Sequence, residues 1–255
     1  MTTAAPLPHL RDVATALLGE DATDAKLARP WLQGEAAPIW LARSAWSLAA
    51  LAAARRAISG RVPRLWLPDY FCNQSTAPLR ATDAALAFYP IGEDLLPDWT
   101  ACRRMAETAP PDLFVLVHYF GAAQPTTDAL AFCRTYGALL IEDAAHVLAP
   151  APGIGAAGDA TLFSPHKLLP IPDGALLLVK GEDLSESVAQ ACRDLGTASP
   201  SPSTWLLKRL IQIATPDGVL RRRLVTQSPA FTDDPAFQQL PRLPRPSAAA
   251  RTTPW

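Results

Sequence analysis

Three ionisable residues, two carboxylates and a lysine, are of the types found in group-transfer sites. Glu142 and Asp143 close the apolar run Leu139–Ile141, and Lys167 follows 24 residues after Asp143. A lysine followed by Leu-Leu-Pro-Ile-Pro is expected to be poorly hydrated, and a desolvated lysine is a usable amine nucleophile. A carboxylate at the end of a buried strand can pair with a cation such as a protonated ring nitrogen. Each residue alone is more typical of a cap or a surface turn, but the combination predicts covalent chemistry at an amine.

A second candidate motif is the G-x-G-x-x-G run Gly153–Gly158. A dinucleotide site needs a strand directly before such glycines and a helix directly after them. Here Pro150 and Pro152 precede the run, and the pattern of Asp159–Phe163 predicts a strand. We therefore expect a flexible loop, which argues against an NAD-dependent Rossmann enzyme.

Composition excludes several classes of protein. The 255 residues carry 23 Lys and Arg against 24 Asp and Glu, so no global field attracts nucleic acid or an anionic membrane. No uncharged run is long enough for a membrane-spanning helix, and no basic segment followed by an apolar one marks a signal peptide, so a cytoplasmic protein is expected. The cysteines lack zinc spacing, which predicts no metal site and four reduced thiols in the core. They are Cys72, Cys102, Cys133 and Cys192.

The elements that must position these side chains alternate between residues 36 and 180. Continuous apolar runs predict strands over 65–67, 84–89, 113–119, 138–142, 160–163 and 175–179. Amphipathic stretches predict helices over 44–58, 72–79, 98–108 and 126–136. Such alternation is typical of the α/β class, with a mostly parallel sheet flanked by helices.

The remaining segments differ in character. Residues 1–35 are expected to form an N-terminal helical segment, and 36–180 the α/β domain. Residues 181–228 predict a helical extension, with helices over 181–197 and 203–225. The last segment, 229–255, is rich in proline and lacks a periodic apolar face, so we expect an irregular tail.

The order of motifs resembles that of the DegT/DnrJ/EryC1/StrS family of sugar aminotransferases, which depend on pyridoxal phosphate and have fold type I. The resemblance covers about residues 35–180 and rests on several motifs in the family's order. They are Arg43–Ala45, Leu67–Cys72, Val117–Gly121, Glu142–His146, Gly158–Ser164 with Lys167, and Asp173–Leu176. The family's large domain, which binds the cofactor, is therefore expected over 36–180.

The resemblance also implies a role for each matching residue. Lys167 would hold pyridoxal 5′-phosphate covalently, and Asp143 would pair with the ring nitrogen. Ser44 and Ala45, at a helix N-terminus, would meet the cofactor phosphate, and Ser164 would offer a further hydroxyl. Phe71, or Tyr70 beside it, would stack on the ring, although strict alignment places Cys72 there. His146 would lie beside the cofactor.

The implied activity is the transfer of an amino group from an amino acid, commonly glutamate, to a keto sugar on a nucleotide carrier. The implied assembly is a homodimer. Family members also have a C-terminal small domain, whereas the last 75 residues here show no second α/β pattern. Two alternatives therefore stay open: an aminotransferase, or a shortened, non-catalytic remnant or binding protein of the same fold.

Overall fold

The structure is a computed structural model that describes residues 8, 9, 11, 12, 14, 23–171, 173–195, 206, 207 and 209–211. The elements below belong to one compact unit, Met1–Arg209. The predicted helix over 203–225 is described only at residues 206, 207 and 209–211, which are helical. The predicted tail over 229–255 lies outside the described residues.

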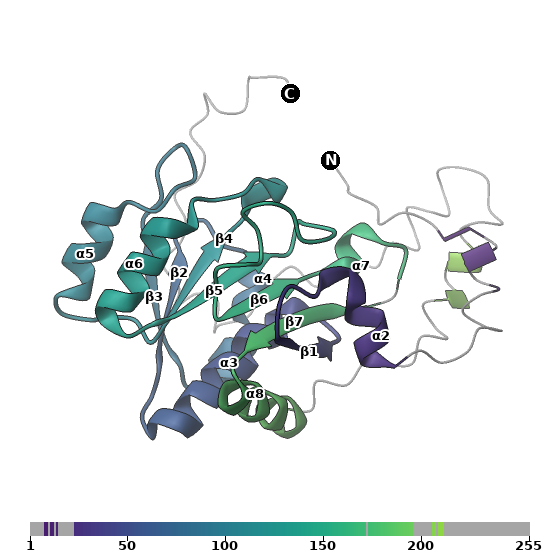
Figure 1. Ribbon diagram of the computed structural model, residues 1–255, viewed down its shortest axis with the longest axis horizontal. Coiled ribbons are helices and arrows are strands. Elements are labelled where there is room, and N and C mark those ends of the chain that lie inside the picture. Colours follow the sequence, from purple (N-terminus) through teal and green to yellow (C-terminus); the bar gives the residue numbers. More distant parts are fainter. Residues whose placement is uncertain are drawn as a thin grey trace. The chain divides into compact units, whose positions relative to one another are not determined.

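The described residues contain a seven-stranded sheet in the order β1-β7-β6-β5-β4-β2-β3 (Figure 1). Its strands are β1 (Ala36–Leu41), β2 (Arg64–Pro68), β3 (Ala85–Tyr89), β4 (Leu113–Val117), β5 (Leu139–Ala144), β6 (Ala160–Phe163) and β7 (Ala175–Lys180). Only β7 runs antiparallel to its neighbours, β1 and β6. The sheet is therefore mostly parallel, as predicted, and the carboxyl ends of the other six strands share one edge.

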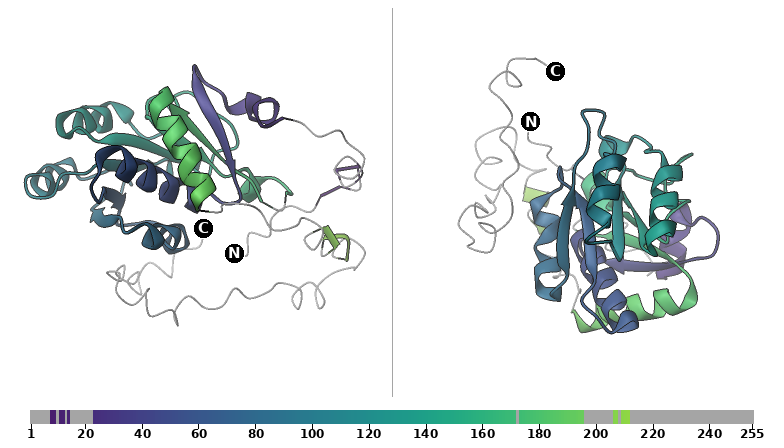
Figure 2. Two further views of the ribbon diagram at one scale, coloured as in Figure 1. Left: turned by 90° about the horizontal axis from the view of Figure 1, so that it is seen from below. Right: turned by 90° about the vertical axis from the view of Figure 1, so that its left-hand side faces the viewer.

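Helices cover both faces of the sheet (Figures 1 and 2). On one face α3 (Ser44–Ser59) packs against α8 (Glu182–Asp194), and α5 (Trp99–Ala106) and α6 (Thr126–Tyr136) lie on the other. Alternate residues of β7 serve the two faces, because side chains along a strand point to opposite sides. Leu177 and Val179 join the core beneath α3 and α8, whereas Leu176 and Leu178 pack with Trp31 on the opposite face.

Short helices complete the described fold. They are α2 (Asp24–Ala28), η1 (Arg29–Trp31), α4 (Asn73–Thr76), η2 (Pro78–Thr82), η3 (Tyr119–Gly121) and α7 (Pro165–Leu168). The α2 and η1 segment is tied to the connection that follows β5, since Trp31 donates a hydrogen bond from Nε1 to the carbonyl of Leu148 at 2.6 Å. Trp31 also meets Trp40 of β1 edge to face, with ring centroids 5.8 Å apart.

The structure differs from the predicted elements in three places. The strand β1 was not predicted, because Ala36–Leu41 is short and contains Pro38. The strand predicted over 113–119 ends at Val117, where the chain turns into η3. The helix predicted over 72–79 is divided into α4 and η2, with Pro78 at the start of the second.

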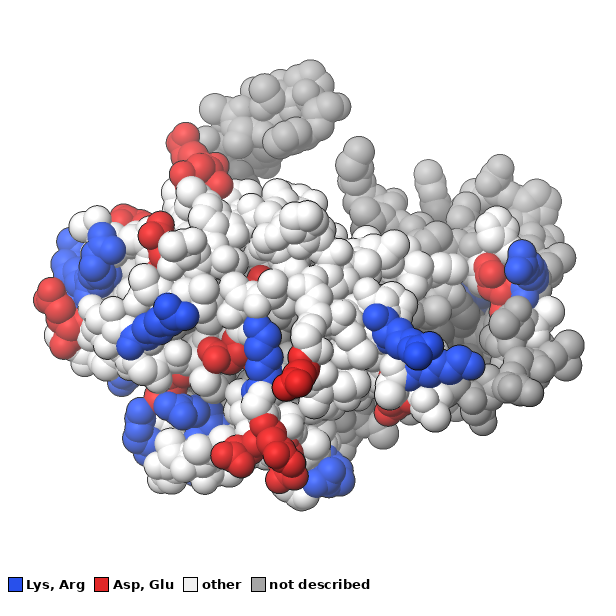
Figure 3. All heavy atoms as spheres, viewed as in Figure 1, with Lys and Arg blue, Asp and Glu red and all other residues white. Residues whose placement is uncertain are grey.

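The distribution of surface charges and the burial of the cysteines can be compared with the expectations from composition. On the face drawn in Figure 3, acidic and basic side chains are interspersed. Within the described residues, no helix is long and apolar enough to cross a membrane, and no cluster of three potential metal ligands occurs. The prediction of four core thiols is wrong for Cys72, which lies exposed beside α4, while the other three are buried. Burial raises the pKa of Cys102 and of Cys133 to about 12.

Candidate functional site

The predicted site residues follow strands that end at the same edge of the sheet. Ser44 and Ala45 come after β1, Phe71 after β2, His146 after β5, and Ser164 and Lys167 after β6, while Asp143 is the penultimate residue of β5. Backbone hydrogen bonds also link the segments that follow β1 and β6 to the segment that precedes β7. The amide of Gly174, which precedes β7, donates to the carbonyl of Ala42 at 3.1 Å, and the amide of His166 donates to the carbonyl of Gly174. Open α/β sheets bind their ligands at this edge.

Asp143 is a buried carboxylate with one described hydrogen bond, in which Oδ1 accepts from the amide of Ala145 at 2.9 Å. Burial raises the pKa of Asp143, because the ionised form loses its hydration. The hydrogen bond from Ala145 and the charges of Lys167 and His146 act in the opposite direction but do not cancel the effect of burial. Asp143 therefore favours a cationic partner at the sheet edge, which would stabilise its ionised form.

Lys167 lies in α7 and not at the end of a strand, and its side chain is exposed. The expected desolvation of this lysine is therefore wrong for the described structure. Its apolar neighbours in sequence do not surround it, because the single turn of α7 points the lysine away from the core. Its charge nevertheless lowers the pKa of both Asp143 and His146, so the amine lies within electrostatic reach of both side chains.

The serines predicted to meet a phosphate occupy two different positions. Ser44 is buried at the first position of α3, so the amides of Ser44 and Ala45 belong to the first turn, whose N–H groups lack intrahelical acceptors. Ser164 directly follows β6 and is fully buried, and its Oγ has no hydrogen-bond partner among the described residues. A buried hydroxyl without a partner is costly, which makes Ser164 a candidate for contact with a ligand.

The aromatic residues after β2 differ in exposure. Phe71 is partly buried and packs against the core, whereas Tyr70 is 52% exposed. The Tyr70 ring stacks on that of Tyr119, with centroids 5.7 Å apart, and Tyr119 donates from its hydroxyl to the carbonyl of Tyr70 at 2.7 Å. Phe71, Tyr70 and Cys72 therefore all stay candidates for a contact with a flat ligand.

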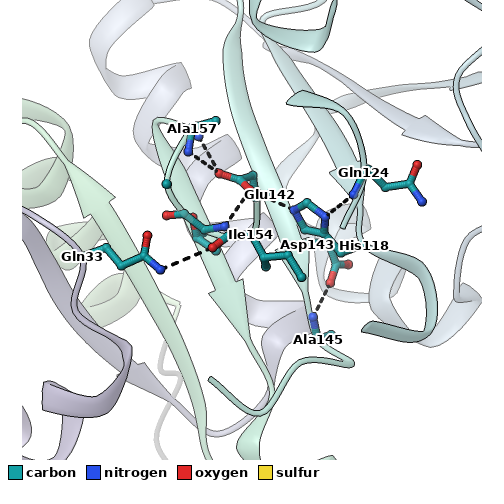
Figure 4. Close-up of polar contacts among 12 residues, drawn as sticks. Gln33, His118, Gln124, Glu142, Asp143, Ala145, Ile154 and Ala157 are labelled. Carbon is teal, nitrogen blue, oxygen red and sulfur yellow. Dashed lines mark hydrogen bonds and ion pairs between the residues drawn. The ribbon is translucent and has the colours of Figure 1, made fainter. Parts of the chain in front are cut away.

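Sequence reasoning missed the central role of Glu142 in the architecture of the site. Its carboxylate is fully buried and accepts four hydrogen bonds (Figure 4). Oε2 accepts from His118 Nε2 at 2.8 Å and from the amide of Gly155 at 2.8 Å. Oε1 accepts from the amides of Ala157 at 2.8 Å and Gly158 at 2.7 Å. Glu142 therefore ties together β4, β5 and the glycine loop.

The hydrogen bonds also fix the charge state of this cluster. His118 Nδ1 accepts from the amide of Gln124 at 3.0 Å, so the ring proton lies on Nε2 and points to Glu142. Burial alone would raise the pKa of Glu142, but the hydrogen bonds from His118, Gly158 and Gly155 outweigh it and hold the pKa below its ordinary value. An ionised Glu142 that accepts a hydrogen bond from the Nε2–H group of His118 follows.

The segment Gly153–Gly158 is a loop, as expected, and it has a structural role. Gly153 and Gly155 adopt positive φ angles of 81° and 85°, a conformation that glycine reaches without strain. A Cβ atom on Gly158 would lie 2.8 Å from the carbonyl oxygen of Ala160 and 2.9 Å from that of Leu140. The loop therefore wraps a protein carboxylate, Glu142, in the way that other glycine loops wrap phosphates. The sequence signal for this role was Glu142 itself, a charged residue that directly follows the apolar run Leu139–Ile141 and precedes the glycine loop.

A comparison with family models places these residues in a known context. Residues 106–205 match the DegT/DnrJ/EryC1/StrS aminotransferase family. The matched segment begins at the end of α5, runs through α8 and includes Asp143, His146, Ser164 and Lys167. This part of the chain is therefore similar to that family, the one that the order of its motifs resembles. No curated protein matches the sequence.

Solved structures of aminotransferases share the fold. The chain is similar to Helicobacter pylori PseC, an aminotransferase involved in the biosynthesis of pseudoaminic acid, with a TM-score of 0.54, 18% identity, and coverage of 65% of this chain and 45% of that one. DesI, whose structure was determined in the presence of its TDP-sugar product, has a TM-score of 0.52 and 22% identity. That match covers 65% of this chain and 42% of DesI. NtdA from Bacillus subtilis, with bound cofactor PMP, has a TM-score of 0.52 and 15% identity. That match covers 66% of this chain and 38% of NtdA. The chain spans less than half the length of each, and these likenesses establish a fold-type-I large domain.

Proposed function

We propose that this chain binds pyridoxal 5′-phosphate and serves an aminotransferase reaction on a sugar. The observation that carries the proposal is that a buried Asp143, an unpartnered Ser164 hydroxyl and an exposed Lys167 all lie at or just after the carboxyl ends of two neighbouring strands, β5 and β6. The family match over residues 106–205 supports it.

The residues present fit this cofactor in charge and in hydrogen bonding. The Oγ of Ser164 is buried without a partner, and a phosphate oxygen would supply the missing acceptor. The first turn of α3 offers the amides of Ser44 and Ala45, and the N-terminal end of a helix favours a negative charge. A protonated ring nitrogen would give Asp143 the cationic partner that its burial calls for.

Each residue would then perform one part of the reaction. Bound pyridoxal phosphate would supply an electron sink for the carbanion formed on the amino donor. Asp143 would hold the ring proton in place through its carboxylate, and Ser164, Ser44 and Ala45 would anchor the phosphate. Lys167 would bind the cofactor through Nζ and, once released, would carry a proton away from the donor carbon at the same atom. His146 would border this position from the end of β5.

Two of the similar solved structures support the substrate classes that we propose. DesI is described with a TDP-sugar product and PseC with the biosynthesis of pseudoaminic acid. We propose glutamate as the amino donor and a nucleotide-linked keto sugar as the acceptor. The proposed assembly is a homodimer, which sedimentation at several protein concentrations would test.

The experiment that tests cofactor binding is a spectroscopic titration with pyridoxal phosphate. Wild type is expected to develop a visible absorbance band, and Lys167→Ala to lose it. Lys26→Ala is the matched control, because Lys26 is an exposed lysine of α2, and it should keep the band. A band of unchanged intensity in Lys167→Ala would show that another amine holds the cofactor.

A second assay separates an enzyme from a binding protein of the same fold. The cofactor-loaded protein is incubated with glutamate, and the formation of 2-oxoglutarate is measured with and without a nucleotide-linked keto sugar. Formation of one equivalent without the sugar and of many with it would support the aminotransferase. A visible band without any 2-oxoglutarate would favour the non-catalytic binding protein.

A further inference from the structure

Phe120 combines an unfavourable backbone conformation with a solvent-exposed ring. Its φ and ψ are 55° and 19°, in the left-handed region that is uncommon for residues other than glycine, asparagine and aspartate. Its side chain is 71% exposed, so burial of the ring contributes little to folding. The following residue, Gly121, also has a positive φ of 85°, and a Cβ atom there would lie 3.2 Å from the carbonyl oxygen of His146, so the backbone of this turn passes close to the turn that carries His146.

The contacts of the Phe120 ring lead to the candidate site. The Phe120 ring lies nearly parallel to that of His146, with an interplanar angle of 11° and ring centroids 6.1 Å apart. It also contacts the Tyr119 ring, with centroids 6.3 Å apart. The stacking and the hydrogen bond between Tyr119 and Tyr70 extend this contact into a row of four rings. The row ends at His146, which lies three residues after Asp143 and within electrostatic reach of Asp143 and Lys167.

The two ends of the stack are held by different parts of the fold. Phe120 is fixed by η3, which follows β4, and by the hydrogen bond from the amide of Gly121 to the carbonyl of His118 at 3.2 Å. His146 follows β5 in an exposed turn, and its ring has no described hydrogen bond. The stack is therefore the described ring contact that restricts the imidazole. Local strain of this kind is typical of residues whose position matters at a functional site.

We propose that Phe120 is a positioning residue that braces the imidazole of His146 beside the cofactor site. The strained backbone aims the phenyl ring at the imidazole, and the phenyl ring limits the orientations that the imidazole adopts next to Asp143 and Lys167. The effect of Phe120 on cofactor binding rests on the proposed function, the binding of pyridoxal phosphate. The contact between Phe120 and His146 exists in the cofactor-free protein, and its contribution to stability can be measured there.

The test compares two variants of Phe120 in two backgrounds. Phe120→Asn removes the ring but keeps a residue that accepts the left-handed conformation, whereas Phe120→Tyr keeps the stack. The dissociation constant of pyridoxal phosphate is expected to rise about two- to tenfold in Phe120→Asn, the range that the loss of one aromatic pair gives, and to change less than about twofold in Phe120→Tyr. The midpoint of urea unfolding in Phe120→Asn is expected to be no lower than in wild type.

The second background, His146→Ala, shows whether Phe120 acts through the imidazole. There Phe120→Asn is expected to leave the dissociation constant unchanged within about twofold, because the braced ring is absent. An equal weakening in both backgrounds, or none in either, would overturn the proposal. A large loss of stability in Phe120→Asn would also overturn it, since Phe120 would then be a core residue.

The cofactor-free protein keeps this inference separate from the proposed function. If wild type binds no pyridoxal phosphate, the proposed function fails. Wild type, Phe120→Asn, His146→Ala and the double variant are then compared by urea unfolding. A measurable coupling free energy between positions 120 and 146 would then support the brace. A coupling of zero would refute it independently of the cofactor.

Discussion

Replacing Glu142 with glutamine keeps the shape of this buried side chain and removes its charge. In the wild type both carboxylate oxygens accept two hydrogen bonds each, from His118 and Gly155 on one and from Ala157 and Gly158 on the other. A glutamine has one accepting oxygen, and its amide group donates. In either orientation, two of the four buried donors therefore face another donor.

The loss can be sized from these contacts. A buried donor without an acceptor costs about 1 to 3 kcal/mol, so two such donors predict a loss of about 2 to 6 kcal/mol. His118 cannot relieve the conflict by moving its proton, because Nδ1 already accepts from the amide of Gln124. The loss is a large share of a total stability that is typically about 5 to 15 kcal/mol.

The assay is urea unfolding followed by circular dichroism, with Glu186→Gln as the matched control. Glu186 is exposed on α8, so its substitution is expected to change stability by less than about 0.5 kcal/mol. The pKa of Glu142 lies below its ordinary value of 4.5 in the folded protein, so ionised Glu142 stabilises the fold above that value. This stabilisation is lost as the pH falls through the folded pKa, and the gap between wild type and Glu142→Gln should narrow in acid. A loss below about 1 kcal/mol at neutral pH, or a gap that widens in acid, would refute the reasoning.

Three further predictions concern the same edge of the sheet. Burial raises the pKa of Asp143, so stability is lost as the pH rises from the unfolded pKa through the folded pKa, and the loss is complete above it. Cofactor-free Asp143→Asn should therefore be at least as stable as wild type in urea at pH 8. The same variant should bind pyridoxal phosphate more weakly in the spectroscopic titration. Gly158→Ala places a Cβ atom 2.8 Å from the carbonyl of Ala160 and should lower the unfolding free energy by about 1 to 3 kcal/mol, measured in the same way. Trp31→Phe removes the hydrogen bond to the carbonyl of Leu148 and should cost about 1 kcal/mol, with increased proteolysis after Leu148 as a second measure.

Much of the fold could be predicted from the periodicity of apolar residues. Continuous apolar runs indicate buried strands in any context, and β6 was predicted with its observed bounds, 160–163. The strand β1 was missed, because its six residues contain a proline and a tryptophan that is only partly buried. Its pairing with β7, which is far away in sequence, makes it a strand.

The environment of single side chains was harder to predict than the elements. The neighbours of Lys167 in sequence are apolar, yet the turn of α7 leaves its amine exposed. Cys72 was expected in the core but lies exposed before α4. Local composition does not determine which way a short helix faces, since this depends on the packing of segments distant in sequence.

The sequence by itself indicated the similarity of the segment around Asp143 and Lys167 to an aminotransferase family, because the order of short motifs can be recognised without knowing their contacts. It also determined the α/β class, since strand and helix periods are local properties of the chain. Only the tertiary structure decided the role of Glu142, which accepts from His118, directly after β4, and from three amides of the glycine loop, 13 to 16 residues after Glu142. Burial of a charge is a property of everything packed around it, and it becomes visible only when those segments meet.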